Sequence, residues 1–152
     1  MGIYFDMAET NFEKLNDYIN KNKIVFPDFV FMSKLICINY LKALLLESDY
    51  TLNNSLTKLI YKTNNLYFLI TIIEKDLQLS IPKELKLMIL YLEKYNVDIK
   101  SYQINKDKIE QNMFYKKAQH TKELSSTDVY NIIKAVKISR VLSIYTICKI
   151  YS

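Results

Sequence analysis

Apolar residues recur along this chain at intervals of three and four positions, which place side chains on one face of an α-helix. The clearest pattern lies between residues 28 and 47, where Phe31, Leu35, Ile38, Leu41 and Leu45 share this spacing. Val30, Ile36, Leu44 and Leu46 widen the apolar surface well beyond one stripe. A helix that is apolar around most of its circumference must be covered by other elements, so the pattern predicts a central helix here.

The same periodicity predicts helices on both sides of this segment. They are expected at about residues 9–22, 54–62, 65–79 and 82–95, and again from residue 125, with a weaker amphipathic helix at residues 107–118. Two capping boxes support these starts, because Glu13 follows Thr10 and Asp128 follows Ser125 at the required spacing. Ser80 is a suitable cap before a helix whose first turn contains Pro82.

The residues after Val141 are compatible with two structures. They are rich in β-branched and aromatic side chains, which favour a strand, but a buried closing helix fits them as well. One Gly and two Pro in 152 residues leave little of the turn chemistry that β-hairpins need. We therefore predict an all-α fold in which residues 1–152 form a single compact domain of five to seven helices.

The composition limits what the basic charge of the chain can mean. The formal net charge is +5, with 21 Lys and Arg against 16 Asp and Glu, but Arg140 is the single arginine. The chain is also rich in Asn, Ile, Lys and Tyr, which is typical of an A+T-rich genome such as that of a virus, a phage, a low-GC bacterium or a protozoan parasite. Its lysines therefore indicate less about nucleic acid than they would in a balanced sequence.

The distribution of apolar residues predicts a soluble, cytoplasmic protein without a membrane partner. Half of the residues are apolar, yet the longest nearly unbroken apolar run, residues 66–73, is far shorter than the roughly 20 residues of a membrane-spanning helix. Asp6, Glu9 and Glu13 stand where a signal peptide would have its basic and apolar regions.

Residue types that several catalytic and cofactor sites require are missing from the sequence. Gly2 is the only glycine, so the Gly-rich loops of P-loop and Rossmann nucleotide sites are excluded. His120 is the only histidine, and neither an HExxH motif nor paired CxxC motifs occur. Cys37 and Cys148 lie far apart in apolar stretches, which is typical of buried free thiols. We expect no enzyme, metal or cofactor, although carboxylates that converge in space would still permit an enzyme.

Two charged patterns are candidate docking surfaces. Glu9, Glu13 and Asp17 share one helical face, which predicts a solvated face or a docking stripe for a basic partner. Five basic residues of the C-terminal third form a candidate nucleic-acid-binding patch: Lys116, Lys117, Lys134, Lys137 and Arg140. Nucleic-acid-binding proteins favour arginine for bidentate contacts, so a solvated lysine face is the simpler interpretation.

One short segment resembles a known motif. Residues 81–85, Ile-Pro-Lys-Glu-Leu, followed by Ile89 and Leu90, resemble the opening of an F-box and the related motif that ends poxviral ankyrin proteins. The resemblance implies a helix that docks an adaptor of a ubiquitin ligase. Ile81 stands where the F-box usually has Leu, and Pro-x-Glu-Leu is also a good start for any helix.

These observations predict a non-enzymatic, helical protein-interaction module whose partner is a host protein or a second copy of the chain. A domain of this size can bury only one or two elements that are apolar all round, and an apolar patch left at the surface usually marks an interface. The segment with Val141, Ile144, Tyr145 and Ile147 therefore either closes the core or forms a homodimer or partner-binding surface. The alternative function is association with nucleic acid through the basic C-terminal third.

Overall fold

The computed structural model describes residues 2–21, 28–48, 51–95 and 124–151, with side chains up to residue 148. Within these residues the fold is all-α and contains no strand. The helices are α1 (Ile3–Lys21), α2 (Asp28–Leu46), α3 (Asn54–Lys62), α4 (Leu66–Lys75), α5 (Lys83–Leu90) and α8 (Ser126–Tyr151), and a 3₁₀ helix, η1 (Tyr91–Lys94), follows α5 directly. The predicted fold class is confirmed, whereas the helix expected at residues 107–118 lies outside the described residues.

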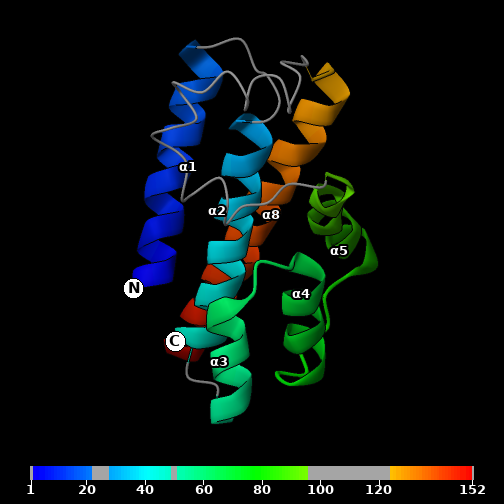
Figure 1. Cartoon of the computed structure of the whole chain (residues 1–152). Helices are drawn as coiled ribbons and strands as arrows, with labels where there is room; N and C mark the ends of the chain where they lie inside the picture. Colours follow the sequence, from blue (N-terminus) through cyan, green and yellow to red (C-terminus); the bar gives the residue numbers. More distant parts are fainter. Residues whose placement is uncertain (1, 22–27, 49–50, 96–123, 152) are drawn as a thin grey trace.

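The core is built around α2, which packs against both α1 and α8 (Figure 1). Most of its 19 residues are buried, and Tyr40 and Phe29 are among the largest fully buried side chains of the protein. By length and composition α2 is apolar enough to cross a membrane, although polar residues interrupt its apolar runs. Because 83% of its apolar window is covered by the rest of the protein, packing in the core accounts for the same composition.

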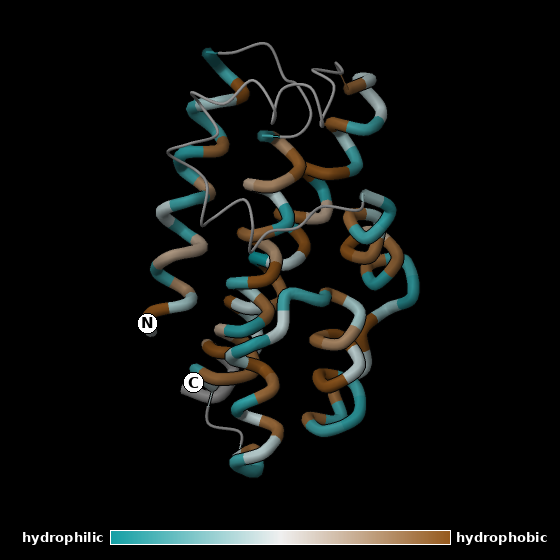
Figure 2. The backbone as a smooth tube through the Cα atoms, viewed as in Figure 1, coloured by the Kyte–Doolittle hydropathy of each residue, from teal (hydrophilic) through white to brown (hydrophobic). Residues whose placement is uncertain are grey.

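The outer helices bury one face each. Along α1, hydrophilic and hydrophobic stretches alternate (Figure 2), and Phe5, Ala8 and Leu15 are its buried residues. This alternation is expected for a helix that covers a core on one side and contacts water on the other.

Small residues allow α8 to approach α2. Ala135, Ser139 and Ser143 are fully buried at four-residue spacing on α8. The hydroxyl of Ser139 donates to the backbone carbonyl of Ala135 at 2.9 Å and also interacts with the thiol of Cys37 on α2. Burial raises the pKa of the Cys37 thiol to about 12, so this thiol stays protonated at neutral pH. Cys148 is exposed, so the prediction of two buried thiols is correct only for Cys37.

The start of α1 differs from the prediction because a distant side chain caps it. The carboxylate of Glu47, just after α2, accepts hydrogen bonds from the backbone N–H groups of Tyr4 and Phe5 at 2.8 and 3.0 Å. These first-turn donors have no partner within their own helix, and a carboxylate also interacts favourably with the N-terminal end of the helix dipole. The helix therefore begins at Ile3, and the capping box expected at Thr10 is wrong.

Other helix starts follow the local sequence more closely. The side chains of Asn53 and Asn65 accept hydrogen bonds from the backbone of α3 and α4, and the hydroxyl of Ser125 accepts one from the N–H of Asp128 at 3.1 Å. The cap by Ser125 is thus confirmed, although the carboxylate of Asp128 accepts from the hydroxyl of Ser125 at 2.8 Å and not from its backbone N–H as in a full capping box. The cap expected at Ser80 is wrong. Pro82 is the N-cap residue of α5, and no side chain hydrogen-bonds the first turn of this helix at that position.

The C-terminal segment is helical throughout. Because α8 continues without a break from Ser126 to Tyr151, the strand alternative for the residues after Val141 is wrong. The β-branched residues of this segment are accommodated in a helix because tertiary packing outweighs their weak intrinsic preference for strands.

Candidate functional site

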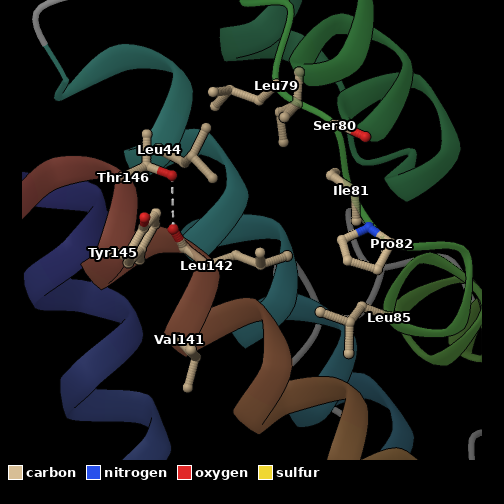
Figure 3. Close-up of a pocket in the computed structure, with 11 residues that line it drawn as sticks. Leu44, Leu79, Ser80, Ile81, Pro82, Leu85, Val141, Leu142, Tyr145 and Thr146 are labelled. Atoms are coloured by element: carbon tan, nitrogen blue, oxygen red, sulfur yellow. Dashed lines mark hydrogen bonds between the residues drawn. The ribbon is translucent and has the colours of Figure 1, made fainter. Parts of the chain in front are cut away.

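A pocket of about 440 Å³ lies between α8, the end of α2 and the connection that leads from α4 into α5; we call it the α5–α8 pocket (Figure 3). One wall is formed by Val141, Leu142, Tyr145 and Thr146 of α8. The facing wall is formed by Leu79, Ile81, Pro82 and Leu85. Pockets of this size are common as binding sites for ligands and for side chains of partners.

The walls of the pocket are almost entirely apolar. In Figure 3 the side chains of Leu142 and Leu85 extend toward each other from opposite walls. The hydroxyl of Thr146 donates to the backbone carbonyl of Leu142 at 2.8 Å, so its hydrogen is already used within α8. A ligand would therefore be held in this pocket by burial of apolar surface rather than by directed hydrogen bonds.

The depth of the pocket follows from the exposure of its residues. Ile73 and Ile81 are almost completely buried and form its inner part. Val141 and Tyr145, one helical turn apart on α8, are 61% and 64% exposed and form its outer rim. The pocket thus opens onto the solvent-facing side of α8.

The connection after α4 has an unusual backbone conformation. Gln78 has a φ of 55°, the only positive value among the described residues other than glycine. A residue in this left-handed region often stops a helix, but glycine or asparagine usually occupies it. The N–H of Leu79 then bonds back to the carbonyl of Ile73 at 3.3 Å, and this turn places Leu79 in the pocket wall.

The four candidate contact residues lie on different faces of α8. Ile147 is only 2% exposed and belongs to the core, and Ile144 is half-buried against it. Val141 and Tyr145 lie on the outer face, at the rim of the α5–α8 pocket. One face of this segment closes the core, and the other carries the exposed apolar surface.

Arg140 has a structural partner. Its Nε donates to Oε1 of Glu9 at 2.6 Å, its Nη2 donates to Oε2 of Glu9 at 3.2 Å, and its guanidinium lies 5.6 Å from the centre of the Phe12 ring. The hydroxyl of Tyr40 donates to the same carboxylate at 2.7 Å. This cluster joins α1, α2 and α8, so neither Arg140 nor Glu9 presents an unengaged charge to a partner.

The ionisation of this cluster is fixed by its contacts. The hydrogen bond from Arg140 is the main cause that lowers the pKa of the Glu9 carboxyl. Burial raises the pKa of Tyr40, which therefore remains a neutral hydrogen-bond donor. Glu13 and Asp17 are exposed on α1, so the acidic stripe expected there is reduced to two residues.

The other predicted basic residues are only partly described. Lys134 and Lys137 are exposed on α8, and the Nζ of Lys134 lies 5.5 Å from the centre of the Tyr130 ring. Lys116 and Lys117 lie outside the described residues, as does His120. Of the five residues in the predicted nucleic-acid patch, the structure therefore shows two, Lys134 and Lys137, whose charges are bound by no carboxylate of the described part of the chain.

A second polar cluster joins η1 to the start of α8. The hydroxyls of Tyr91 and Ser125 both donate to the carboxylate of Asp128, and the Nζ of Lys94 lies 3.6 Å from it. The hydrogen bond from Tyr91 is the main cause that lowers the pKa of Asp128. We interpret this cluster as a tie between two elements, because all of its groups are engaged with one another.

The segment that resembles an F-box is held by its buried isoleucines, whereas Pro82, Lys83 and Glu84 are exposed. Ile81 and Ile89 are 6% and 0% exposed, and Pro82 and Leu85 line the α5–α8 pocket. Sequence reasoning selected Val141 and Tyr145 but missed this opposite wall, because nothing in the pattern of α5 indicates that α8 lies across from it.

Within the described residues, no group of His, Cys, Asp and Glu side chains could hold a metal ion. The candidate binding feature that the described residues offer is the apolar α5–α8 pocket with its exposed rim. Comparison with known protein families, with curated proteins and with solved structures found no match, so the function must be argued from this geometry.

Proposed function

We propose that this protein is a non-enzymatic helical module that binds a protein partner through the α5–α8 pocket. The observation that carries the proposal is the combination of an apolar pocket of about 440 Å³ with a rim, Val141 and Tyr145, that is more than half exposed. Large apolar side chains at the mouth of a pocket remain costly to hydrate until something covers them. A partner that inserts a bulky apolar side chain would bury both the pocket and its rim.

The composition of the rim favours a protein over a small ligand. Interfaces between proteins combine a deep apolar anchor site with surrounding aromatic residues, and tyrosine is enriched among the residues that contribute most binding energy. Tyr145 lies at the rim, and Leu87, which is 58% exposed, lies on the adjacent helix α5. We propose a host protein or a second copy of this chain as the partner, in the cytoplasm.

Association with nucleic acid is the second candidate function. It is supported by the exposed Lys134 and Lys137, together with the neighbouring aromatic ring of Tyr130. Lysine contacts with phosphate and aromatic stacking are both used by proteins that bind single strands. We rank it second because Arg140 is held by Glu9 and because nucleic acid has no apolar side chain to fill the pocket.

Site-specific photocrosslinking tests the proposal directly. Benzoylphenylalanine would replace Tyr145 at the rim or, as a matched control, Tyr67 on α4, since these tyrosines are 64% and 65% exposed. After irradiation of cells that contain the protein, adducts would be separated and identified by mass. We expect a protein adduct from position 145 that is absent from position 67.

Each result has a definite meaning. A crosslink between two copies of this chain selects the homodimer, and a crosslink to another protein selects a heterologous partner. Nucleic-acid adducts at position 145 would contradict the proposal in favour of the second candidate. Equal adduct yields from positions 145 and 67 would also contradict it, because the rim would then contact other molecules no more than an ordinary exposed tyrosine does.

A further inference from the structure

The exposed face of α8 carries lysines next to the apolar rim of the pocket. Along this face lie, in order, Tyr130, Lys134, Lys137, Val141 and Tyr145, at the helical spacing that places them in one line. Asp128, in the first turn, is the only residue of α8 with a carboxylate side chain, and Tyr91 and Ser125 both donate hydrogen bonds to it.

Three carboxylates among the described residues are engaged with other groups. Asp128 accepts hydrogen bonds from Tyr91 and Ser125, and Glu9 binds Arg140. Glu74 pairs with Lys86 at 3.2 Å. No carboxylate among the described residues pairs with Lys134 or Lys137, so this face of α8 combines an apolar anchor site with positive charge on one side of it.

The distances between Val141 and the two lysines along α8 determine how far apart the matching groups of a partner must be. At a rise of about 1.5 Å per residue, Lys137 lies about 6 Å and Lys134 about 10 Å from Val141 along the helix axis. In a helical partner that runs beside α8, these distances correspond to one and two turns, so groups four and seven residues from the anchor would face the lysines.

We infer that the segment bound by the α5–α8 pocket is an acidic amphipathic helix. It inserts one bulky apolar side chain into the pocket and places Asp or Glu four and seven residues away, opposite Lys137 and Lys134. This inference rests on the proposed function and adds the chemistry of the partner to it. Nucleic acid supplies matching negative charge but no apolar anchor, so the combined surface fits an acidic protein segment better.

Designed peptides test the inference, and the absence of Trp from this chain provides a clean signal. The probe is a helical peptide with Trp as anchor and Glu four and seven residues away. It is made in two versions, one with the Glu residues before the Trp and one with them after it. Matched peptides carry Lys at the two Glu positions, or Ser in place of Trp. Binding would be followed by fluorescence anisotropy of a terminal dye, and a blue shift of the Trp emission would report its burial.

We expect the Glu peptide to bind at least about tenfold more tightly than the Lys peptide at low salt, a difference of about 1.4 kcal/mol that shrinks as salt is added. The double variant Lys134→Glu with Lys137→Glu should reverse this preference. Lys58→Glu with Lys62→Glu on α3 changes the net charge equally at two other exposed lysines and should leave the preference unchanged.

The failures of the two proposals are distinguishable. Equal binding of the Glu and Lys peptides, both dependent on Trp, would overturn the acidic-partner inference and leave the pocket as a binding site. Binding that is unaffected when Ser replaces Trp would overturn the role of the pocket itself. If a short DNA duplex displaces the Glu peptide from the wild type but not from the Lys134→Glu, Lys137→Glu variant, the inference is overturned in favour of nucleic acid. If none of the peptides binds, the acidic-helix inference is also overturned.

Discussion

Arg140 and Glu9 bind each other across the fold, through two contacts of 2.6 and 3.2 Å between residues that are 131 positions apart in the chain. The pair lies beside Tyr40, so one carboxylate connects the N-terminal helix, the central helix and the C-terminal helix. The contact is made by the single arginine of a lysine-rich chain. A planar guanidinium can bind both oxygens of a carboxylate, whereas an ammonium group acts as a point charge.

The first prediction concerns the energy of this pair. Both side chains are about one-third exposed, so we expect a coupling energy of about 1 kcal/mol, below that of a buried pair. The measurement is a double-mutant cycle of Glu9→Gln and Arg140→Gln by urea unfolding. Arg140→Lys should recover only part of the loss. Additive effects of the two single substitutions would show that the contact does not stabilise the fold.

The second prediction follows from the ionisation of Glu9. Its pKa lies below the ordinary value of 4.5, chiefly because Arg140 hydrogen-bonds the carboxylate. A lowered pKa stabilises the fold fully above the ordinary pKa, and this contribution is lost as the pH falls through the lowered pKa. The free energy of unfolding should therefore fall less in Glu9→Gln than in the wild type between about pH 6 and about pH 3. Identical pH profiles for the two proteins would contradict this.

The central helix shows what the sequence pattern could predict. Its apolar residues lie around most of the helix circumference and therefore predicted burial on all sides. The structure shows α2 at Asp28–Leu46 within the core. The local cap at Ser125 was equally readable, because both partners of the capping box are three residues apart. By contrast, Glu47 caps α1 from more than 40 residues away, and no local pattern reveals such a partner.

Of the two walls of the α5–α8 pocket, only the wall formed by α8 could be anticipated from the sequence. The sequence left the residues after Val141 open between strand and helix, but their excess of apolar side chains predicted a segment that either closes the core or forms an interface. Which face remained exposed depends on where α2 and α5 pack, and this is a tertiary property. The opposite wall, with Leu79 and Leu85, becomes visible only once the turn at Gln78 has set the path of the chain.

The third prediction concerns this turn. A left-handed conformation costs a residue with a Cβ roughly 1 kcal/mol, and glycine avoids most of this cost. Gln78→Gly should therefore raise the free energy of unfolding by about 0.5–1 kcal/mol, even though glycine also gains freedom in the unfolded chain. Gln78→Ala, which keeps a Cβ, should give no such gain. Thermal melts of both variants decide the matter, and a lower melting temperature for Gln78→Gly would refute the argument.

The fourth prediction tests the nucleic-acid alternative. If Lys134, Lys137 and further lysines contact about six phosphates, affinity should fall by roughly 10³-fold between about 50 and 200 mM salt. Lys134→Glu with Lys137→Glu should then abolish the binding. Gel-shift measurements with single- and double-stranded probes would show this. We expect no shift at low salt, because the main basic group capable of bidentate contacts, Arg140, is bound to Glu9.

The last prediction separates the two faces of α8. Ile147 is buried and Val141 is exposed, although they are only six residues apart on one helix. Ile147→Asp should destabilise the fold by several kcal/mol, because a carboxylate without a partner would be placed in the apolar core. Val141→Asp should change the free energy of unfolding by no more than about 0.5 kcal/mol, since its side chain remains in water.

Val141→Asp should nevertheless abolish capture of a partner or self-association, because it places a negative charge at the rim of the pocket. Thermal melts and sedimentation of both variants provide the readout. A Val141→Asp protein that keeps wild-type association while Ile147→Asp unfolds would show that this segment serves the core alone.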